Sequence, residues 1–454
     1  MARSRDFITP RLWGVPWFEK PPLLYWITAV GSVCGLGPEL AGRLPVALLS
    51  LGFLATAFVL LRREFGFESA ALSVGLLATS AGWVAFSGLA LTDLPMAVFF
   101  SIAVFLVLPV LRPTPDLSRL HWRFAAIGVS LGLAALGKGL VPLALALPML
   151  WFLTRFWRLW WIPALAFVLI AGPWYVAVSL RYGYPFIAEF FIRHHLERLY
   201  SPSLQHVQPW YYFFPVALAG LLPWTPLFFL LLRSRRPPMD SRQQLLFATF
   251  CFGFLLFSVS LNKLPGYLLP LFPHAFAVLG ARLHGRQLAE ISRAWLAPCA
   301  LCIAAFPLAA SILPGTLAAG RLSLASFQWP TKTEWFYIAI PLAIVFVARR
   351  SWAVPLLILS LVASGLYVKA TAYPTLEREV SARGLWRELS GVSAKLCDSG
   401  MNRDWIYGLS FYRDAFLTPC QPGEAKLHLH ARDGGRPAIV PCEGKTGQRS
   451  SRLR

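Results

Sequence analysis

The sequence predicts an α-helical polytopic membrane protein, and three observations support this class. Hydrophobic residues make up 57% of the 454 residues, the mean hydropathy is +0.58, and only 14% of the residues are charged. Apolar runs such as 352–368 carry no charge and approach the roughly 20 residues that a helix needs to cross a bilayer. A soluble domain of this length needs a more polar surface, so the composition favours a membrane protein.

The formal net charge of +21 would suggest nucleic-acid binding in a soluble protein. Here the basic residues lie in short loops between apolar runs, which is typical of membrane topology and of contact with anionic lipids. The charge therefore predicts membrane lipids as partners and no nucleic acid.

Three long apolar stretches each contain one charged residue near the middle. Each stretch is too long for one crossing and fits a helical hairpin with the charge at its turn, where Gly, Pro or capping residues also occur. The stretches are 69–111 with Asp93, 124–153 with Lys138, and 245–281 with Lys263.

Arginines flank these hairpins in alternate loops, which the positive-inside rule assigns to the cytoplasm. The turns with Asp93, Lys138 and Lys263 then face outward, as do the loop at residues 181–209 and the part after Tyr373. The sparse charges of the apolar region thus collect at one membrane face. The arginines lie at positions 62–63, 112, 119, 123, 155, 158, 233–242, 282–293 and 349–350.

The hydropathy pattern predicts about twelve transmembrane helices and four parts of the chain. Residues 23–36 are short for a span and are expected to lie along the outer surface. The predicted parts are an outer-face segment (1–39), a multi-span domain (40–372), a small periplasmic α/β domain (373–442) and a disordered basic tail (443–454). The spans are 40–61, 68–87, 94–111, 124–137, 139–153, 156–178, 209–232, 243–260, 264–281, 294–314, 335–348 and 352–372.

The C-terminal part has the composition of a soluble unit. We expect a helix over 376–396 and strands at "DWIYG" (404–408) and "KLHLHA" (426–431). If this part faces an oxidising compartment, a Cys397–Cys420 disulfide is the natural pairing among its cysteines.

The stretch "WFEKPP" places Glu19 and Lys20 among aromatic residues and directly before two prolines. One interpretation is an interfacial ion pair in a loop anchored by tryptophans. The other is a rigid loop that presents Lys20 to an anion. Lys20, Lys263 and Lys138 would then form a cationic site at the outer face, suited to a phosphate or diphosphate.

Asp93 and Tyr267 also have two interpretations each. Asp93 precedes Leu94-Pro95 and could cap a helix, a role that is compatible with an active-site carboxylate. Tyr267 follows Lys263 by four positions, so both share a helix face if Pro265 begins the next helix. A phenol beside an ammonium suits a phosphate oxygen, but position alone equally indicates an aromatic-belt tyrosine.

The loop "YPFIAEFFIRHHLERLYSP" has helical spacing between Glu189 and Arg193 and between His194 and Arg198. An amphipathic lid that carries the two arginines toward an anion is favoured over a metal site at His194, His195 and Glu197. Adjacent histidines point in different directions on a helix. There is no Walker loop, Rossmann glycine pattern or Ser/His/Asp signature. No cofactor is predicted to be required, and a divalent metal is not indicated.

Several motifs together resemble a known family. They resemble the membrane-embedded C-type glycosyltransferases of the lipid A aminoarabinose transferase and protein O-mannosyltransferase group, over about residues 6–281. The motifs, in order, are "DFITPRLWGVPWFEKPPLLYW", "LTDLPMA", "LGKGLV", "GPWYVAV", "FFIRHHLERL", "GLLPWTP" and "NKLPGYLLPLFP". The resemblance implies transfer of a sugar from a polyprenyl-phosphate carrier to lipid A or another envelope acceptor. It also implies a bacterial inner membrane location with a periplasmic active site.

The resemblance also implies roles for individual residues. Lys20, Arg198 and Tyr267 are expected to contact the carrier phosphate, and Glu19 and Asp93 to shape the sugar and acceptor site. In the family, an acidic motif on a first transmembrane helix lies just upstream of the sequence that matches residues 2–7. We therefore expect a misassigned start codon or a truncated gene.

Two other classes of function are weighed against a glycosyltransferase. A transporter or flippase should carry charges near the bilayer midplane and often two related halves, whereas here the charges lie at one face and no halves match. An inactive relative that only binds carrier lipid is the third alternative, because the family's acidic motif is absent from the sequence.

Overall fold

The structure is a computed structural model, and it divides into two compact units. Unit 1 comprises Met1–Ala300 and Val347–Ile358, and unit 2 comprises Leu301–Phe346 and Leu359–Arg454. The structure describes residues 1–115, 119–197, 207–233, 238–283, 291–319, 323–324, 327, 329, 332–389, 391, 396–421, 427–430 and 436–440.

Unit 1 is helical apart from a short antiparallel hairpin, β1 (Arg11–Leu12) and β2 (Val15–Pro16). Its first α-helices are α1 (Leu23–Val33), α2 (Pro38–Phe65), α3 (Phe67–Ala78), α4 (Ala81–Ser87), α5 (Asp93–Val107), α6 (Leu120–Lys138), α7 (Val141–Leu145), α8 (Leu147–Phe152), α9 (Trp161–Tyr182) and α10 (Tyr184–Ile187). The later ones are α12 (Phe213–Gly220), α13 (Thr225–Arg233), α14 (Ser241–Val259) and α15 (Phe272–Arg282). Between them lie the 3₁₀ segments η1 (Leu108–Leu111), η2 (Thr154–Leu159), η5 (Trp210–Tyr212) and η6 (Pro265–Leu271), and the π-helix η3 (Ala188–Glu197).

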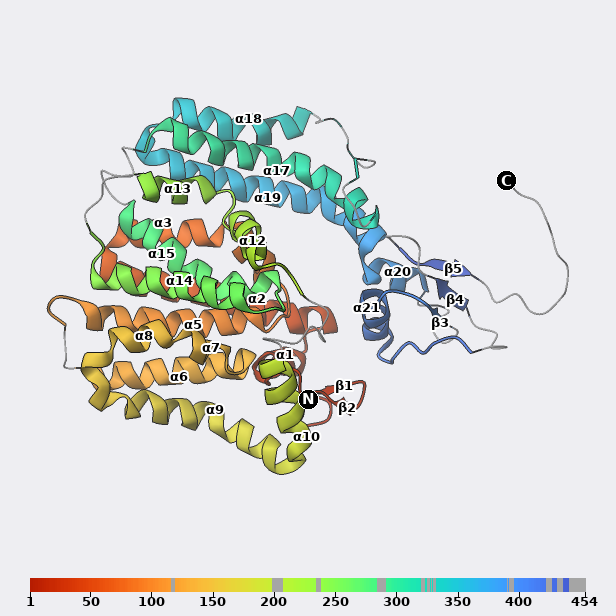
Figure 1. The fold of residues 1–454 in the computed structure, drawn as a ribbon. Helices are drawn as coiled ribbons and strands as arrows, with labels where there is room; N and C mark the ends of the chain where they lie inside the picture. The colour runs from red at the N-terminus through yellow and green to blue at the C-terminus, as the bar shows by residue number, and fades with distance from the viewer. Residues whose placement is uncertain are drawn as a thin grey trace, which may run out of the picture. The chain divides into compact units, whose positions relative to one another are not determined.

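The helix α5 lies at the centre of unit 1 because it is apolar on all sides. It packs against α2, α6 and η6, and 72% of its membrane-length window is buried, against 17% for α9. Figure 1 shows α9, α6 and α5 as successive neighbours. Glycine permits the close contact of α6 with α9, since a Cβ at Gly128 would lie 2.2 Å from the Pro163 carbonyl oxygen.

Among the described residues, seven helices are long and apolar enough to cross a membrane, or up to nine if two bent pairs each count as one span. The bends are 65° between α3 and α4 and 107° between the segments 210–220 and 225–231. The chain is thus a multi-pass membrane protein, and the number twelve stays a prediction. The predicted span 139–153 consists of the short helices α7 and α8, and the predicted span 264–281 begins as the 3₁₀ segment η6 before α15.

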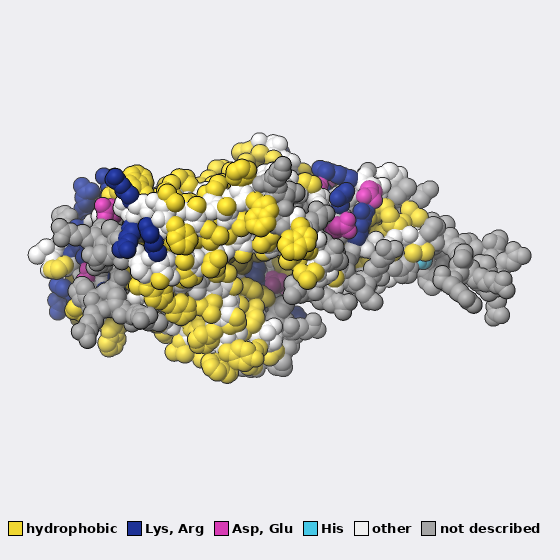
Figure 2. Space-filling view, turned by 90° about the horizontal axis from the view of Figure 1, so that it is seen from above, with side chains coloured by type: hydrophobic (Ala, Val, Ile, Leu, Met, Phe, Trp, Pro, Cys, Tyr) yellow, Lys and Arg dark blue, Asp and Glu magenta, His cyan; other side chains and the backbone are white. Residues whose placement is uncertain are grey.

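A buried ion network joins the ends of several unit 1 helices. Glu64, at the end of α2, receives two hydrogen bonds from Arg112, of 2.9 and 2.7 Å, and lies 3.4 Å from Arg242 at the start of α14. Arg282, at the end of α15, donates to Gln243 beside it. These groups lie at helix ends where arginines gather in the sequence. The face seen in Figure 2 is largely hydrophobic, and Lys and Arg side chains lie away from its middle.

Unit 2 contains an apolar helical part and a small domain with a three-stranded sheet. The helices are α17 (Arg293–Ala319) and α19 (Arg350–Val380), which both units share, and α18 (Lys332–Val347), α20 (Ala382–Leu389) and α21 (Arg403–Arg413). The strands are β3 (Leu396–Ser399), β4 (Leu427–His430) and β5 (Ala438–Val440). β4 is central, parallel to β3 and antiparallel to β5.

The structure corrects two predictions in this domain. The segment 404–408, predicted as a strand, belongs to helix α21, whose Leu409 is buried in a cluster with Leu385 and Leu429. Tertiary packing of an apolar stripe thus outweighed the β propensity of Trp, Ile and Tyr. The helix predicted over 376–396 is also wrong as one element, since α19 ends at Val380, α20 ends at Leu389, and Leu396 already begins β3.

Two other predictions in this domain are confirmed. A strand lies within 426–431, and the disulfide joins Cys397 to Cys420. The predicted boundary at 372/373 falls inside the continuous helix α19, and the predicted tail 443–454 lies outside the described residues.

Candidate active site

Three residues from different helix ends meet at one polar cluster, Asp93, Lys138 and Tyr267. Asp93 begins α5 and Lys138 ends α6, and the Lys138 ammonium forms an ion pair with Asp93 Oδ1. The same ammonium lies 4.6 Å from the centre of the Tyr267 ring in η6. The Lys138 and Asp93 side chains are only 11% and 15% exposed, and Tyr267 is 7% exposed. Two predicted hairpin turns thus come together, and they hold a charge pair with a phenol.

The backbone of η6 fits tightly against this cluster. A Cβ at Gly266 would lie 2.7 Å from Asp93 Oδ1 and 2.9 Å from the Phe86 ring. Only a residue without a side chain allows this approach.

Replacing Gly266 with alanine is therefore expected to disrupt the pair. The added methyl group must displace the Asp93 carboxylate or shift η6, at a cost of about 1–3 kcal/mol in the free energy of unfolding. The matched control is Gly88→Ala, since a Cβ at Gly88 meets no atom within 4 Å. Thermal unfolding in detergent measures both variants, and equal melting temperatures would contradict the close approach.

Lys263 lies in a separate position. It is 3% exposed, and its ammonium donates to the carbonyl oxygens of Ser260 and, at 3.0 Å, Gln208. Burial lowers the pKa of Lys263. Pro265 begins η6 as expected, but Lys263 precedes this segment, so the expected shared helix face with Tyr267 does not form. The reason is a local β-bridge between Asn262 and Val207, which holds this turn extended.

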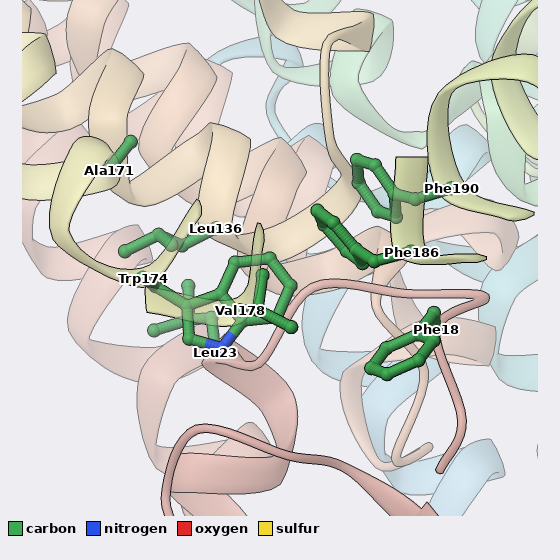
Figure 3. Close-up of a cluster of buried hydrophobic side chains, with 8 residues drawn as sticks. All are labelled: Phe18, Leu23, Leu136, Ala171, Trp174, Val178, Phe186 and Phe190. Atoms are coloured by element: carbon green, nitrogen blue, oxygen red, sulfur yellow. The ribbon is translucent and has the colours of Figure 1, made fainter. Parts of the chain in front are cut away.

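The loop with Glu19 and Lys20 is held by hydrophobic packing on both sides. Phe18 and Leu23 flank it and belong to a buried cluster (Figure 3) whose other members are Leu136, Ala171, Trp174, Val178, Phe186 and Phe190. Because Leu136 is two residues before Lys138, this cluster ties the loop to the end of α6. Phe18 lies edge-on to Phe186 at 5.4 Å, and Phe186 stacks on Phe190 at 5.3 Å.

Glu19 and Lys20 form an ion pair at this loop. Lys20 Nζ lies 3.0 Å from Glu19 Oε1, and the two side chains are 21% and 31% exposed. The ion pair of the first interpretation is therefore present, and the presentation of Lys20 to an anion stays a prediction. A partly exposed pair of this kind contributes little to stability, so a bound anion can replace Glu19 as the partner of Lys20 at low cost.

A group that the sequence analysis missed fixes the N-terminal segment. Asp6 accepts hydrogen bonds from the amides of Ile8 and Thr9, at 3.2 and 3.1 Å, and from Arg181 at 3.1 Å. Trp174 donates to the Ile8 carbonyl at 2.9 Å. The signal in the sequence was a short polar side chain, Asp6, two residues before "ITP", which is typical of a side-chain-stabilised turn.

Two cavities adjoin this segment and contain further residues that were missed. One has a volume of about 600 Å³ and is lined by Arg3, Arg11 and Tyr25, among others. The other, of about 730 Å³, is lined by residues that include Arg11 and Arg181. Burial, with a further contribution from the charge of Glu19, raises the pKa of Tyr25 to about 12. The first cavity therefore lies within electrostatic reach of the Glu19–Lys20 loop.

Asp6 gives the N-terminal segment a pH-dependent anchor. Burial by itself would raise the pKa of Asp6, but the hydrogen bonds from Thr9 and Ile8 and the charge of Arg181 outweigh it, so the pKa is lowered from 3.8. A lowered carboxyl pKa contributes stability that is present above the unfolded value and is lost as the pH falls through the folded value.

We therefore expect Asp6→Asn to lower the melting temperature at about pH 6, and expect this difference to shrink as the pH falls below the unfolded pKa of 3.8. Thermal unfolding of the variant and the unmodified protein across this range tests the linkage. A difference that stays constant with pH would show that the Asp6 carboxylate charge is not involved.

The remaining predicted site residues lie in or beside η3. Glu189 and Arg193 form an ion pair at 3.2 Å, four residues apart, and the lid that carries the arginines toward an anion stays a prediction. Arg198 lies outside the described residues, as do the side chains of His194, His195 and Glu197. Within the described part of the chain, the one cluster of His, Cys, Asp or Glu with metal-ligand spacing is Cys397, Cys420 and His428.

Comparisons with known proteins point to one group. A family model described as dolichyl-phosphate-mannose-protein mannosyltransferase matches residues 1–192. An undecaprenyl phosphate-α-4-amino-4-deoxy-L-arabinose arabinosyl transferase of Pseudomonas aeruginosa (strain LESB58) is 30% identical over 60% of this chain and 50% of its own length. Transferase 2 of the same description from Pseudomonas fluorescens is 27% identical over 63% of this chain and 50% of its own length. The chain thus spans about half the length of the curated relatives it matches.

A solved structure matches over most of the chain. ArnT from Cupriavidus metallidurans bound to undecaprenyl phosphate is 25% identical, with a TM-score of 0.72, over 93% of this chain and 80% of that one. The apo structure of the same protein is 23% identical with a TM-score of 0.68, and supports the fold alone.

Proposed function

We propose that this membrane protein, which has the fold of the C-type glycosyltransferases, transfers a sugar from an undecaprenyl-phosphate-type carrier to an envelope acceptor such as lipid A, another glycan or a protein. The observation that carries the proposal is the structural match over 93% of the chain to a protein solved with undecaprenyl phosphate. The polar cluster and the rigid Glu19–Lys20 loop supply the groups that such a reaction needs.

Cleavage of the bond between the sugar and the carrier leaves negative charge on a phosphate. Preorganised cations at that position stabilise the transition state more than the ground state, because the negative charge develops there as the bond breaks. We assign the phosphate contacts to Lys20, Arg198 and Tyr267. Lys138 and Lys263 add positive electrostatic potential near the phosphate. Lys138 is held by its ion pair with Asp93, and Lys263 by its hydrogen bond to the Gln208 carbonyl.

The carboxylates have the complementary role. A hydroxyl acceptor needs a base to take its proton, whereas an ionised phosphate acceptor attacks without one. We assign Asp93 and Glu19 to the sugar and acceptor site. Each forms an ion pair with a lysine, Asp93 with Lys138 and Glu19 with Lys20.

We place the active site at the periplasmic face of the inner membrane, together with the C-terminal domain. Support comes from the two ends of the unit 1 helices. At one end, Asp93 begins α5 and Lys138 ends α6. At the opposite end, Arg112 follows η1 and Arg242 begins α14, and both contact Glu64. The positive-inside rule assigns that basic end to the cytoplasm.

Transfer from radiolabelled polyprenyl-phosphate sugars tests this function. Membranes are taken from the source organism with the gene at its native locus, so that every residue encoded there is present, and are compared with membranes of a deletion strain. We expect label in the lipid A, glycan or protein fraction only when the gene is present. Movement of labelled carrier across the membrane without transfer would instead indicate a flippase. Carrier binding with neither movement nor transfer would indicate an inactive relative.

A further inference from the structure

The disulfide of the C-terminal domain has a histidine beside it. The Sγ atoms of Cys397 and Cys420 and an imidazole nitrogen of His428 all lie within 4.8 Å of one another. Cys397 is buried and the other two residues are half-buried. Two thiolates and an imidazole are ligands that Zn²⁺ prefers, and such a set leaves a fourth tetrahedral position for water.

Backbone pairing, independent of the S–S bond, places these three residues. Cys397 in β3 pairs with His428 in the parallel strand β4. On the other side of β3, the Cys420 amide donates to the Asp398 carbonyl and the Asp398 amide donates to the Thr418 carbonyl, both at 2.9 Å. The sheet thus holds all three ligand residues together whether or not the sulfur atoms are bonded.

We propose that the reduced domain binds one thiophilic divalent cation of the Zn²⁺ class through Cys397, Cys420 and His428. A dithiol reductant transfers two electrons and two protons to the disulfide, which gives two cysteine thiols and an oxidised, cyclic disulfide of the reductant. The cation then displaces the two thiol protons, which pass to solvent, and the neutral imidazole of His428 completes the protein ligands.

Under oxidising conditions the disulfide joins β3 to the segment at Cys420. Under reducing conditions the metal ion would join these two segments to each other and, through His428, to β4. The domain therefore keeps the connection between β3 and the segment at Cys420 in both redox conditions. This site is separate from the candidate active site in unit 1, and its existence does not depend on the proposed transferase function.

Cobalt provides the test, because Co²⁺ substitutes for Zn²⁺ and absorbs visible light in a tetrahedral thiolate site. The full chain is purified in detergent, with Cys34, Cys251, Cys299, Cys302 and Cys442 replaced by alanine so that the two thiols of the site remain. After reduction by a phosphine in the absence of oxygen, we expect one Co²⁺ per chain with thiolate-to-metal charge-transfer absorption. The oxidised protein should bind none.

The variant His428→Gln identifies the third ligand. It should weaken Co²⁺ binding by at least about tenfold, because even residues that only support a metal ligand change the metal affinity by about that much. The control His121→Gln should leave the Co²⁺ affinity unchanged. Binding by the reduced protein that is equally tight in His428→Gln, or no binding at all, would overturn the proposal.

A second measurement covers the case in which His428→Gln fails to fold. Thermal unfolding of the reduced protein that keeps His428 is followed with and without Zn²⁺, and Zn²⁺ should raise the melting temperature of the reduced form but not of the oxidised form. The absence of any Zn²⁺ effect on the reduced form would equally overturn the proposal.

Discussion

Replacing Asp93 with alanine is expected to destabilise unit 1 by about 3–5 kcal/mol and to abolish transfer. The variant leaves the Lys138 ammonium, only 11% exposed, without the carboxylate that neutralises it. The adjacent Tyr267 ring offers a cation–π contact, but such a contact replaces only a part of the lost interaction. Unfolding in detergent measures stability, and transfer from labelled carrier measures activity.

A double variant separates the two effects of this change. Asp93→Ala with Lys138→Met removes both charges and puts an apolar side chain of similar length in the buried position. It should recover most of the stability, because no uncompensated charge remains, but it should not recover transfer. Recovery of transfer in the double variant would remove Asp93 from the chemistry and leave it a structural role only.

Replacing Lys20 with alanine is expected to lower transfer by about 10²–10³-fold with little change in the melting temperature. The loss follows from removing a cation from the leaving phosphate. The small effect on stability follows from the 21% exposure of Lys20 in its ion pair, since pairs of this kind contribute about 0–1 kcal/mol. Transfer assays and thermal unfolding on the same preparation distinguish the two quantities.

The control for Lys20 is Lys369→Ala, which removes the same charge from an exposed position on α19. It should retain full transfer. Lys20→Arg should retain part of the activity, because it keeps the charge but changes a point donor into a planar one. Unchanged transfer in Lys20→Ala would exclude Lys20 as the phosphate contact and restrict the loop to an anchoring role.

Helix positions were predictable from the sequence wherever an apolar run stood between basic loops. The predicted spans 40–61, 94–111 and 243–260 correspond closely to α2, to α5 with η1, and to α14. The runs 139–153 and 264–281 were equally apolar but fold into short or 3₁₀ segments. Hydropathy indicates that a segment is buried in a membrane or a core. It does not indicate where a new helical segment begins, as α7 does at Pro142 and η6 does at Pro265.

The C-terminal domain illustrates a different limit. Cys397 and Cys420 could be paired because few cysteines lie in the polar part, and the structure joins them. The segment 404–408 was assigned to a strand by its residue types, although it becomes part of the helix α21. In a short segment without clear periodicity, contacts such as that of Leu409 with Leu385 decide the conformation.

The sequence by itself determined that this chain is a multi-pass helical membrane protein and that its sparse charges lie at hairpin turns. Hydropathy and the cost of burying a charge fix both features locally. Only the tertiary structure decided which charges meet. It paired Lys138 with Asp93, directed Lys263 to two carbonyl oxygens, and placed His428 beside the disulfide. Partners distant in sequence depend on how helices and strands pack, and a one-dimensional pattern does not contain that information.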